Sequence, residues 1–339
     1  MPRRITGGKA PGSRRPVAGI TALVPPEIIY SAGWSALDIN NGIPASDCRP
    51  RSKLCAWTAG WREGILSGSI RPDALIVVAG GDCHNALADG QNAARKVKAS
   101  HFFFYPFDGD KDYLRKQLVE LEDFLQKHGG TKGFDYEAAE RIGRLKQLGL
   151  RLDRLRSDGS IDPQAAFKAL ISFSDLEGDP ARFQKKVAAL VKGARDHSAT
   201  ERIGGLPRVA LIGVPPIYRD FHKVCAEAGL HVVFDELPYE FVRLGGSTLE
   251  ELARSYSTYT FARPVQHRLD FLGNELKRRK IDGIVHYTQF TCHHLLEDGL
   301  LRERLKWPML TVQGDLPGET PAQLRLRLEA FGELLGSFE

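Results

Sequence analysis

The sequence predicts an α/β protein made of two doubly wound parallel-sheet lobes with an inserted helical segment. Two blocks of the chain alternate short apolar, β-branched runs with helical stretches, which is typical of parallel sheets covered by helices on both faces. The stretch between these blocks is rich in charge, and its apolar residues follow helical spacing. In each block one buried strand leads into a cysteine, which indicates that the two lobes repeat one plan.

The chain of 339 residues is long enough for more than one compact unit. The first residues carry five cationic side chains and no acidic one before Glu27, and we expect a solvated leader there rather than an arm that binds nucleic acid. The four expected parts are a disordered basic tail at 1–16, an N-terminal α/β lobe at 17–107, a helical insert at 108–204 and a C-terminal α/β lobe at 205–339.

In the N-terminal lobe, residues 17–24 form the first predicted strand because they are a short and almost continuous apolar run. A helix is expected to begin at Pro25 and Pro26, since proline is tolerated in the first helical turn. The other predicted strands are 34–39, 74–79 and 101–105, and the other predicted helices are 53–66 and 85–97.

The helical insert is expected to contain amphipathic helices that pack into a bundle. Breaks near residues 129–130 and 157–159, which contain glycine, should separate these helices. The apolar stripes are Leu114, Leu118, Leu121 and Leu125, followed by Ile142, Leu145, Leu148 and Leu152.

In the C-terminal lobe, strands and helices alternate again. The strand predicted at 284–287 takes the place that 74–79 has in the first lobe, and both lead towards a cysteine. The other predicted strands are 209–214, 232–234 and 309–312, and helices are expected near 217–229, 265–280, 295–305 and 320–335.

Composition and missing motifs exclude several classes of function. No apolar run approaches the ~18–20 residues of a membrane span, and no sustained apolar core follows the basic tail as in a signal peptide. We therefore expect a cytoplasmic protein without a membrane partner, and the net charge of +5 is too modest and dispersed to indicate a nucleic-acid partner. The sequence contains no Gly-x-Gly-x-x-Gly fingerprint, P-loop or Gly-x-Ser-x-Gly elbow.

The cysteines are the strongest functional signal. Cys83 and Cys292 follow predicted buried strands, where open α/β sheets place their ligand sites, so they suggest a metal or iron–sulfur site in the cleft between the lobes. The third ligand is either Cys55, at the start of a predicted helix that favours a thiolate, or Cys48 in a loop rich in proline and arginine. Cys225 is expected to be a buried hydrophobic residue.

The type of site stays open at this point. Structural zinc usually shows a tight Cys-x-x-Cys pair, which this sequence lacks, so three distant thiolates suit a cubane cluster better. Three buried cysteines without any metal are an equal alternative. His84, His293 and His294 adjoin the strand-end cysteines, where they could complete a zinc site, hydrogen-bond in a polar cleft or donate to cluster sulfurs.

Several segments resemble those of a known family, which comprises the activator-dependent 2-hydroxyacyl-CoA dehydratases together with the benzoyl-CoA reductase subunits and double-cubane cluster proteins. The resemblance extends from about residue 18 to 336. Residues 24–33 look like the opening "VPEEIIYAAG", and residues 54–60 look like the first cluster-cysteine segment. Residues 208–215 are similar to the opening strand of the second lobe, and residues 259–270 resemble a helix that contains an arginine, here Arg268. Residues 314–315 and 323–331 close the match.

The resemblance implies an iron–sulfur cluster, either one [4Fe–4S] cubane or a double cubane. Its ligands would be Cys55, Cys83 and Cys292, which favours Cys55 over Cys48. It identifies no catalytic acid or base. Weaker candidates for contacts with the substrate or around the cluster are Ser31, His84, Gln289 and His293.

The resemblance also implies a reaction and partners. A separate ATP-hydrolysing iron–sulfur activator would supply one electron, which passes to a CoA thioester. The reduced thioester would expel the 2-hydroxyl group and lose a proton from C3, and the electron would return once the enoyl product has formed. A homologous subunit would complete a homo- or heterodimer. A basic cluster near the Cys55 helix, Arg62 included, could meet an acidic activator or be a solvated face. The alternatives are a low-potential reductase of the benzoyl-CoA reductase or double-cubane type, and a non-catalytic or zinc-binding partner subunit.

Overall fold

The computed structural model describes residues 15–46, 55–79, 83–194 and 205–337. Most of the predicted basic tail and the alternative ligand Cys48 lie outside the described residues. The chain divides into two compact units, and each contains one parallel sheet. Unit 1 comprises Met1–Lys146, Ser174–Phe183 and Arg243–Pro264, and unit 2 comprises Gln147–Phe173, Gln184–Val242 and Val265–Glu339.

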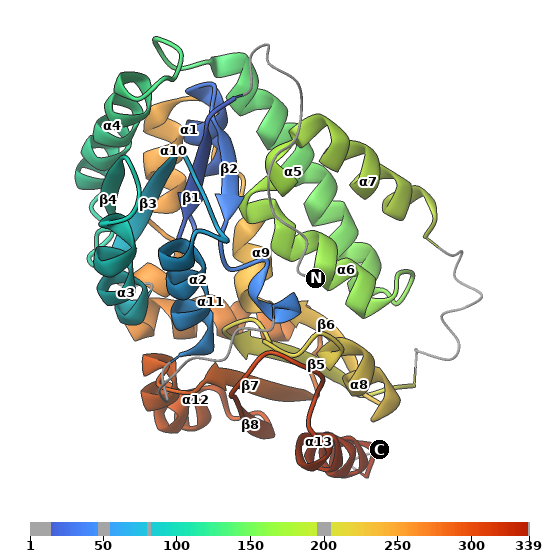
Figure 1. Cartoon of the computed structure of the whole chain (residues 1–339). Coiled ribbons are helices and arrows are strands. Elements are labelled where there is room, and N and C mark those ends of the chain that lie inside the picture. The colour runs from blue at the N-terminus through green and yellow to red at the C-terminus, as the bar shows by residue number, and fades with distance from the viewer. Residues whose placement is uncertain (1–14, 47–54, 80–82, 195–204, 338–339) are drawn as a thin grey trace. The chain divides into compact units, whose positions relative to one another are not determined.

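The sheet of unit 1 has four parallel strands in the order β2-β1-β3-β4 (Figure 1). All six residues of β3 are apolar and buried, as expected for an inner strand covered on both faces. The strands are β1 (Val17–Ile20), β2 (Ser35–Asp38), β3 (Ala74–Ala79) and β4 (Ser100–Phe104). The α-helices that lie wholly in unit 1 are α1 (Pro26–Ser31), α2 (Ala56–Ser67), α3 (His84–Ala94), α4 (Lys111–Lys127) and α10 (Leu249–Tyr256).

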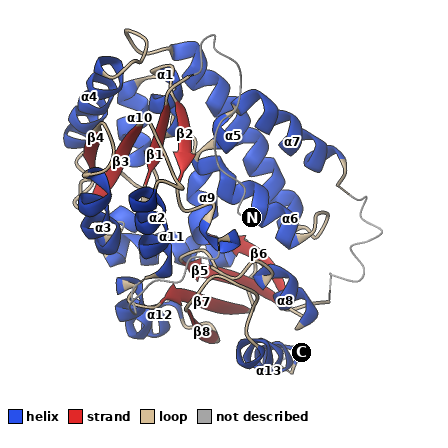
Figure 2. Cartoon of the chain, in the orientation of Figure 1, coloured by secondary structure: helices blue, strands red, loops and turns tan. Residues whose placement is uncertain are grey.

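The sheet of unit 2 also has four parallel strands, in the order β6-β5-β7-β8, and Figure 2 shows helices beside each sheet. An apolar core of β5, β6 and β7 residues packs with α11 and α12. The strands are β5 (Arg208–Gly213), β6 (His231–Asp235), β7 (Gly283–Gln289) and β8 (Met309–Gly314). The α-helices are α6 (Pro163–Ile171), α8 (Phe221–Glu227), α9 (Glu236–Phe241), α11 (Val265–Arg278), α12 (Asp298–Leu305) and α13 (Ala322–Gly336), and the 3₁₀ helix η6 (His293–Glu297) precedes α12.

Between β4 and β5 the described residues form helices and no strand, as predicted. The stripe on α4, from Leu114 to Leu125, is fully buried, whereas Leu148 on α5 is only half-buried. α5 (Tyr136–Ser157) and α7 (Pro180–Lys192) each contribute residues to both units. None of the described helices is long and apolar enough to cross a membrane.

The two sheets repeat one plan, which confirms the predicted two doubly wound sheets. In both, the first strand in sequence pairs with the second and the third, and the third pairs with the fourth. An aspartate before the third strand fastens it to the start of the first. The carboxylate of Asp73 accepts the Val17 N–H at 2.8 Å, and that of Asp282 accepts the Arg208 N–H at 2.7 Å.

Two details of the fold differ from the sequence prediction. β1 ends at Ile20 rather than at residue 24, because the Thr21 hydroxyl, and not a main-chain carbonyl, accepts the Val78 N–H at 2.9 Å. A side-chain hydrogen bond thus takes the place of the next main-chain hydrogen bond between β1 and β3. The helices α9 and α10 were not predicted, and α8 is shorter than the predicted 217–229.

Candidate functional site

Cys83 and Cys292 both lie just beyond the carboxyl end of the third strand of a sheet, as predicted. Cys83 is the N-cap residue of α3, and its Sγ accepts the Ala86 N–H at 3.4 Å. Cys292 is the N-cap residue of η6, and its N–H donates to the Gln289 carbonyl at 2.8 Å. Both cysteines are half-buried. The repeated topology therefore places the two thiols at equivalent positions of the two sheets.

Cys55 is the N-cap residue of α2 and is buried. Burial raises the pKa of its thiol, while the polar groups of Thr58 and of the Trp57 backbone act in the opposite direction. Cys225 lies fully buried in α8, which confirms its prediction as a hydrophobic core residue, and burial raises the pKa of its thiol as well. The preference for Cys55 over Cys48 stays a prediction.

The three predicted ligands are divided between the units, with Cys55 and Cys83 in unit 1 and Cys292 in unit 2. Within the described residues of either unit, no three His, Cys, Asp or Glu side chains are arranged to hold a metal ion. The three-cysteine site stays a prediction.

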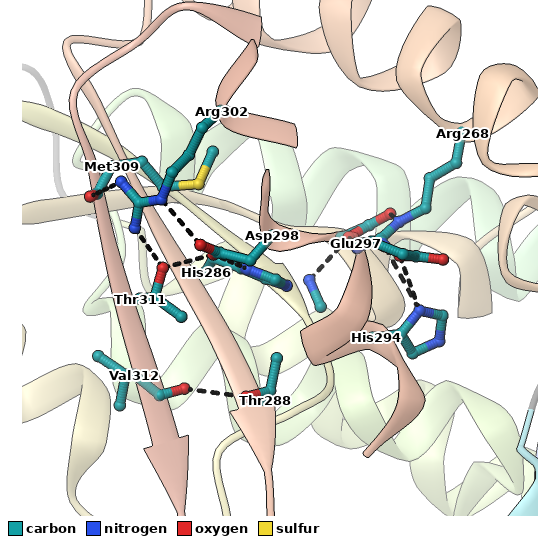
Figure 3. A network of polar contacts seen from close by, with 12 residues as sticks. Arg268, His286, Thr288, His294, Glu297, Asp298, Arg302, Met309, Thr311 and Val312 are labelled. Atoms are coloured by element: carbon teal, nitrogen blue, oxygen red, sulfur yellow. Dashed lines mark hydrogen bonds and ion pairs between the residues drawn. The ribbon is translucent and has the colours of Figure 1, made fainter. Parts of the chain in front are cut away.

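Arg268 on α11 organises polar residues of the segment that follows Cys292 in the sequence, among them His294 and Glu297 (Figure 3). Its Nε and Nη2 donate to the two oxygens of Glu236 at 2.6 and 2.7 Å, and its Nη1 pairs with Glu297 on η6. Glu236 in turn accepts the Gly213 N–H at 2.8 Å, while Nδ1 of His294 lies 3.0 Å from a Glu297 oxygen. This network connects the ends of β5 and β6 to the short helix that begins after Cys292.

The network keeps its charges in a buried environment. Burial alone would lower the pKa of Arg268, but Glu236, followed by Glu297 and Cys292, raises it above its ordinary value. Burial would raise the pKa of Glu297, but His294 and Arg268 lower it to about 2. The Arg268 cation therefore faces both carboxylates and also acts on the thiol of Cys292.

A second network lies on β7, β8 and α12 of the same unit (Figure 3). Nδ1 of His286 lies 2.7 Å from Asp298, which also accepts hydrogen bonds from Thr311 and, at 2.8 Å, from Arg302. Burial would raise the pKa of Asp298, but these partners lower it to about 2, and burial lowers the pKa of His286. The carboxylate orients the buried imidazole and fastens α12 to the sheet.

In unit 1, one ion pair links the two helices that begin at cysteines. Arg62 on α2 pairs with Asp89 on α3 at 2.5 Å, and the two side chains are 18% and 12% exposed. α3 also lies close to β3, since a Cβ at Gly90 would stand 2.4 Å from Val77. Arg62 is thus engaged within the protein, while the other members of the predicted basic cluster (Arg49, Arg51 and Lys53) lie outside the described residues.

The weaker candidates occupy different environments. Ser31 is buried on α1, where its hydroxyl donates to the Asp135 carbonyl at 2.9 Å, so it has a structural contact. Gln289 is buried at the end of β7, and its amide donates to the Asp315 carbonyl. His84 is exposed at the start of α3, and His293 is half-buried with its ring centroid 4.1 Å from that of His294.

Sequence reasoning missed the carboxylates of both networks and the Arg62–Asp89 pair. Glu236 and Arg268 are 32 residues apart, so no local periodicity joins them. Glu297 and Asp298 carried a weak signal, because both follow Cys292 within one short segment.

Comparison with known proteins gives one informative match. Residues 21–335 match the protein family described as "2-hydroxyglutaryl-CoA dehydratase, D-component". No curated protein matches the chain. Among solved structures, the substrate-binding protein titled "SBP FpvC from Pseudomonas aeruginosa in complex with Mn2+" aligns with 96% of this chain and 100% of its own length. At 12% identity and a TM-score of 0.24, that likeness carries no argument.

Proposed function

The chain belongs to the 2-hydroxyglutaryl-CoA dehydratase D-component family, and we propose that it is the iron–sulfur subunit of a 2-hydroxyacyl-CoA dehydratase-like enzyme. The observation that supports this proposal is a family match over nearly the whole chain, in which three cysteines begin helices. The proposed reaction is the radical elimination of water from a CoA thioester, started by one electron from an ATP-hydrolysing activator. The proposed assembly is a homo- or heterodimer with a homologous subunit.

The donor chemistry of these residues fits an iron–sulfur cluster. A cysteine at a helix N-cap has backbone N–H groups directed at its sulfur, and these favour the thiolate that iron requires. Ala86 supplies such a group to Cys83 at 3.4 Å, and Cys55 occupies the same N-cap position of α2. Three thiolates would hold a [4Fe–4S] cluster and leave one iron without a cysteine ligand.

When bound, such a cluster would supply low-potential one-electron transfer. In this proposal, two ion pairs of the chain hold the cysteines that bind the cluster. Arg62 and Asp89 join the helices that begin at Cys55 and Cys83, and Arg268 and Glu297 fasten the segment after Cys292. In this proposal, the two pairs fix ligand positions and take no part in the elimination.

The first test is anaerobic purification followed by iron, acid-labile sulfide and zinc analysis. About four irons and four sulfides per chain support one cubane, whereas twice these amounts would favour a double-cubane reductase. A colourless protein with zinc or no metal would contradict the proposal and favour a non-catalytic partner subunit.

Single substitutions then identify the ligands. Cys55→Ala, Cys83→Ala and Cys292→Ala should each abolish cluster absorbance, while Cys48→Ala should leave it largely intact. Cys225→Ala is the matched control, because that thiol is fully buried in the α8 core. Loss of absorbance in Cys48→Ala, with retention in Cys55→Ala, would show that Cys48 and not Cys55 is the ligand.

Turnover of a panel of CoA thioesters completes the test. Elimination should require the activator together with ATP, because ordinary cellular reductants do not reach the potential of a thioester. Equal rates with and without ATP would reject the proposed reaction.

A further inference from the structure

Two buried indole N–H groups on α2 have no hydrogen-bond partner among the described residues. They belong to Trp57 and Trp61, which are one helical turn apart on the helix that begins after Cys55. A buried donor without a partner costs about 1–3 kcal/mol, so most buried N–H groups are paired in folded proteins. Two such donors on one helix therefore need an explanation.

Trp57 differs from Trp61 in its distance from the predicted ligand. It is the second residue of α2 and lies two residues after Cys55, in the first turn of the helix. Its buried indole N–H is therefore available close in sequence to the predicted ligand. Trp61 lies a turn further into the helix and is fully buried.

We propose that the indole N–H of Trp57 donates a hydrogen bond to a sulfur of the iron–sulfur group held by Cys55. This inference rests on the proposed function. Trp57 then helps to position the cluster and to set its reduction potential, and its indole N–H gains the hydrogen-bond partner that it otherwise lacks.

The proposed hydrogen bond has a definite electrostatic consequence. A reduced cluster carries one more negative charge than an oxidised one, so an N–H donor to sulfur stabilises the reduced form more and raises the reduction potential. Removal of the donor should make the potential more negative. The expected change in the redox equilibrium is about tenfold, which for one electron corresponds to about 59 mV.

The test compares Trp57→Phe with Trp61→Phe in the full chain, purified anaerobically. The midpoint potential is measured by a redox titration followed by electron paramagnetic resonance, and exchangeable protons near the cluster are detected by the same resonance after transfer to D₂O. Trp57→Phe should shift the potential negatively and lose one exchangeable proton coupling. Trp61→Phe should keep both the wild-type potential and the coupling, although it also removes a buried indole.

A structural role alone would not produce this pair of results. If Trp57→Phe fails to hold iron, 3-benzothienylalanine at position 57 keeps the ring shape and removes only the N–H. An unchanged potential and coupling in either variant at position 57, or equal shifts in Trp57→Phe and Trp61→Phe, would overturn the inference while leaving the proposed function intact. A wild-type protein without iron and sulfide would instead overturn the proposed function itself.

Discussion

The two sheets share strand order and the aspartate that fastens the third strand, yet they secure their strand-end cysteines differently. In unit 1, the Arg62–Asp89 pair joins the helices that begin at Cys55 and Cys83, and both side chains retain some exposure. In unit 2, Arg268 is 1% exposed and holds two carboxylates at once. The same strand order is thus combined with a partly exposed ion pair in one unit and with a buried charge network in the other.

This difference determines which substitutions should matter. A partly exposed ion pair is screened by water and contributes little, whereas a buried pair is costly to break because one charge is left without a partner. The cysteine segment of unit 2 should therefore depend far more on its arginine than that of unit 1.

The largest effect is expected for Arg268→Gln. This change leaves Glu236 fully buried without its cation, and it should lower the free energy of unfolding by about 3–5 kcal/mol. Urea denaturation followed by circular dichroism measures this loss. Arg302→Gln is the control in the same unit, because Arg302 is 43% exposed and its loss should cost less than about 1 kcal/mol. Similar losses in the two variants would contradict the expected difference between a buried and an exposed ion pair.

The next effect concerns a buried carboxyl pair in unit 1. Asp175 accepts the backbone N–H of Asp38 at 2.9 Å, and burial, together with the charge of Asp38, raises the pKa of Asp175 to about 7. The unfolded chain loses this proton near 3.8, whereas the folded unit retains it to about pH 7. The contribution of Asp175 to the free energy of unfolding is thus fully present below pH 3.8 and is lost as the pH rises to 7.

Asp175→Asn tests this dependence, since the amide cannot titrate. The difference in unfolding free energy, wild type minus variant, should fall by a few kcal/mol between pH 4 and pH 8. Glu137→Gln is the control, because Glu137 is 89% exposed. A flat difference across this range would mean that Asp175 titrates as an ordinary carboxyl group.

Unit 2 should respond to pH with the opposite sign. The pKa of Glu297 is lowered from 4.5 to about 2, so its contribution is present above pH 4.5 and is lost as the pH falls towards 2. Because Glu297 is partly exposed, we expect a change of only about 1–2 kcal/mol. The difference in unfolding free energy between the wild type and Glu297→Gln should shrink on acidification, and the exposed Glu303→Gln variant should show no such trend.

The sequence predicted the sheets well because strand signals are local. β3 coincides with its predicted bounds since a continuous apolar run sits between polar turns. β1 was predicted too long because Thr21 ends the ladder through a side-chain contact that periodicity does not show. α10 was missed although its capping box, Thr248 with Glu251, is visible in the sequence.

The candidate site was predictable only in part. A strand followed by a cysteine is a local pattern, so the positions of Cys83 and Cys292 could be predicted from neighbouring residues. The partners of Arg268 come from separate segments, and only the folded chain brings them together. The buried contact of Lys146 with Glu27 at 2.6 Å was missed for the same reason.

The smallest effect is expected for Arg62→Gln, and it is the sharpest test of the comparison. Arg62 and Asp89 are 18% and 12% exposed, so water can still reach Asp89 once the cation is removed. We expect a loss of about 1 kcal/mol in urea denaturation, above that of the exposed Arg141→Gln and well below that of Arg268→Gln. A loss of about 4 kcal/mol would show that unit 1 depends on its ion pair as strongly as unit 2. The two cysteine-bearing segments would then be held with equal strength, and the burial of an ion pair would not determine how much it contributes to stability.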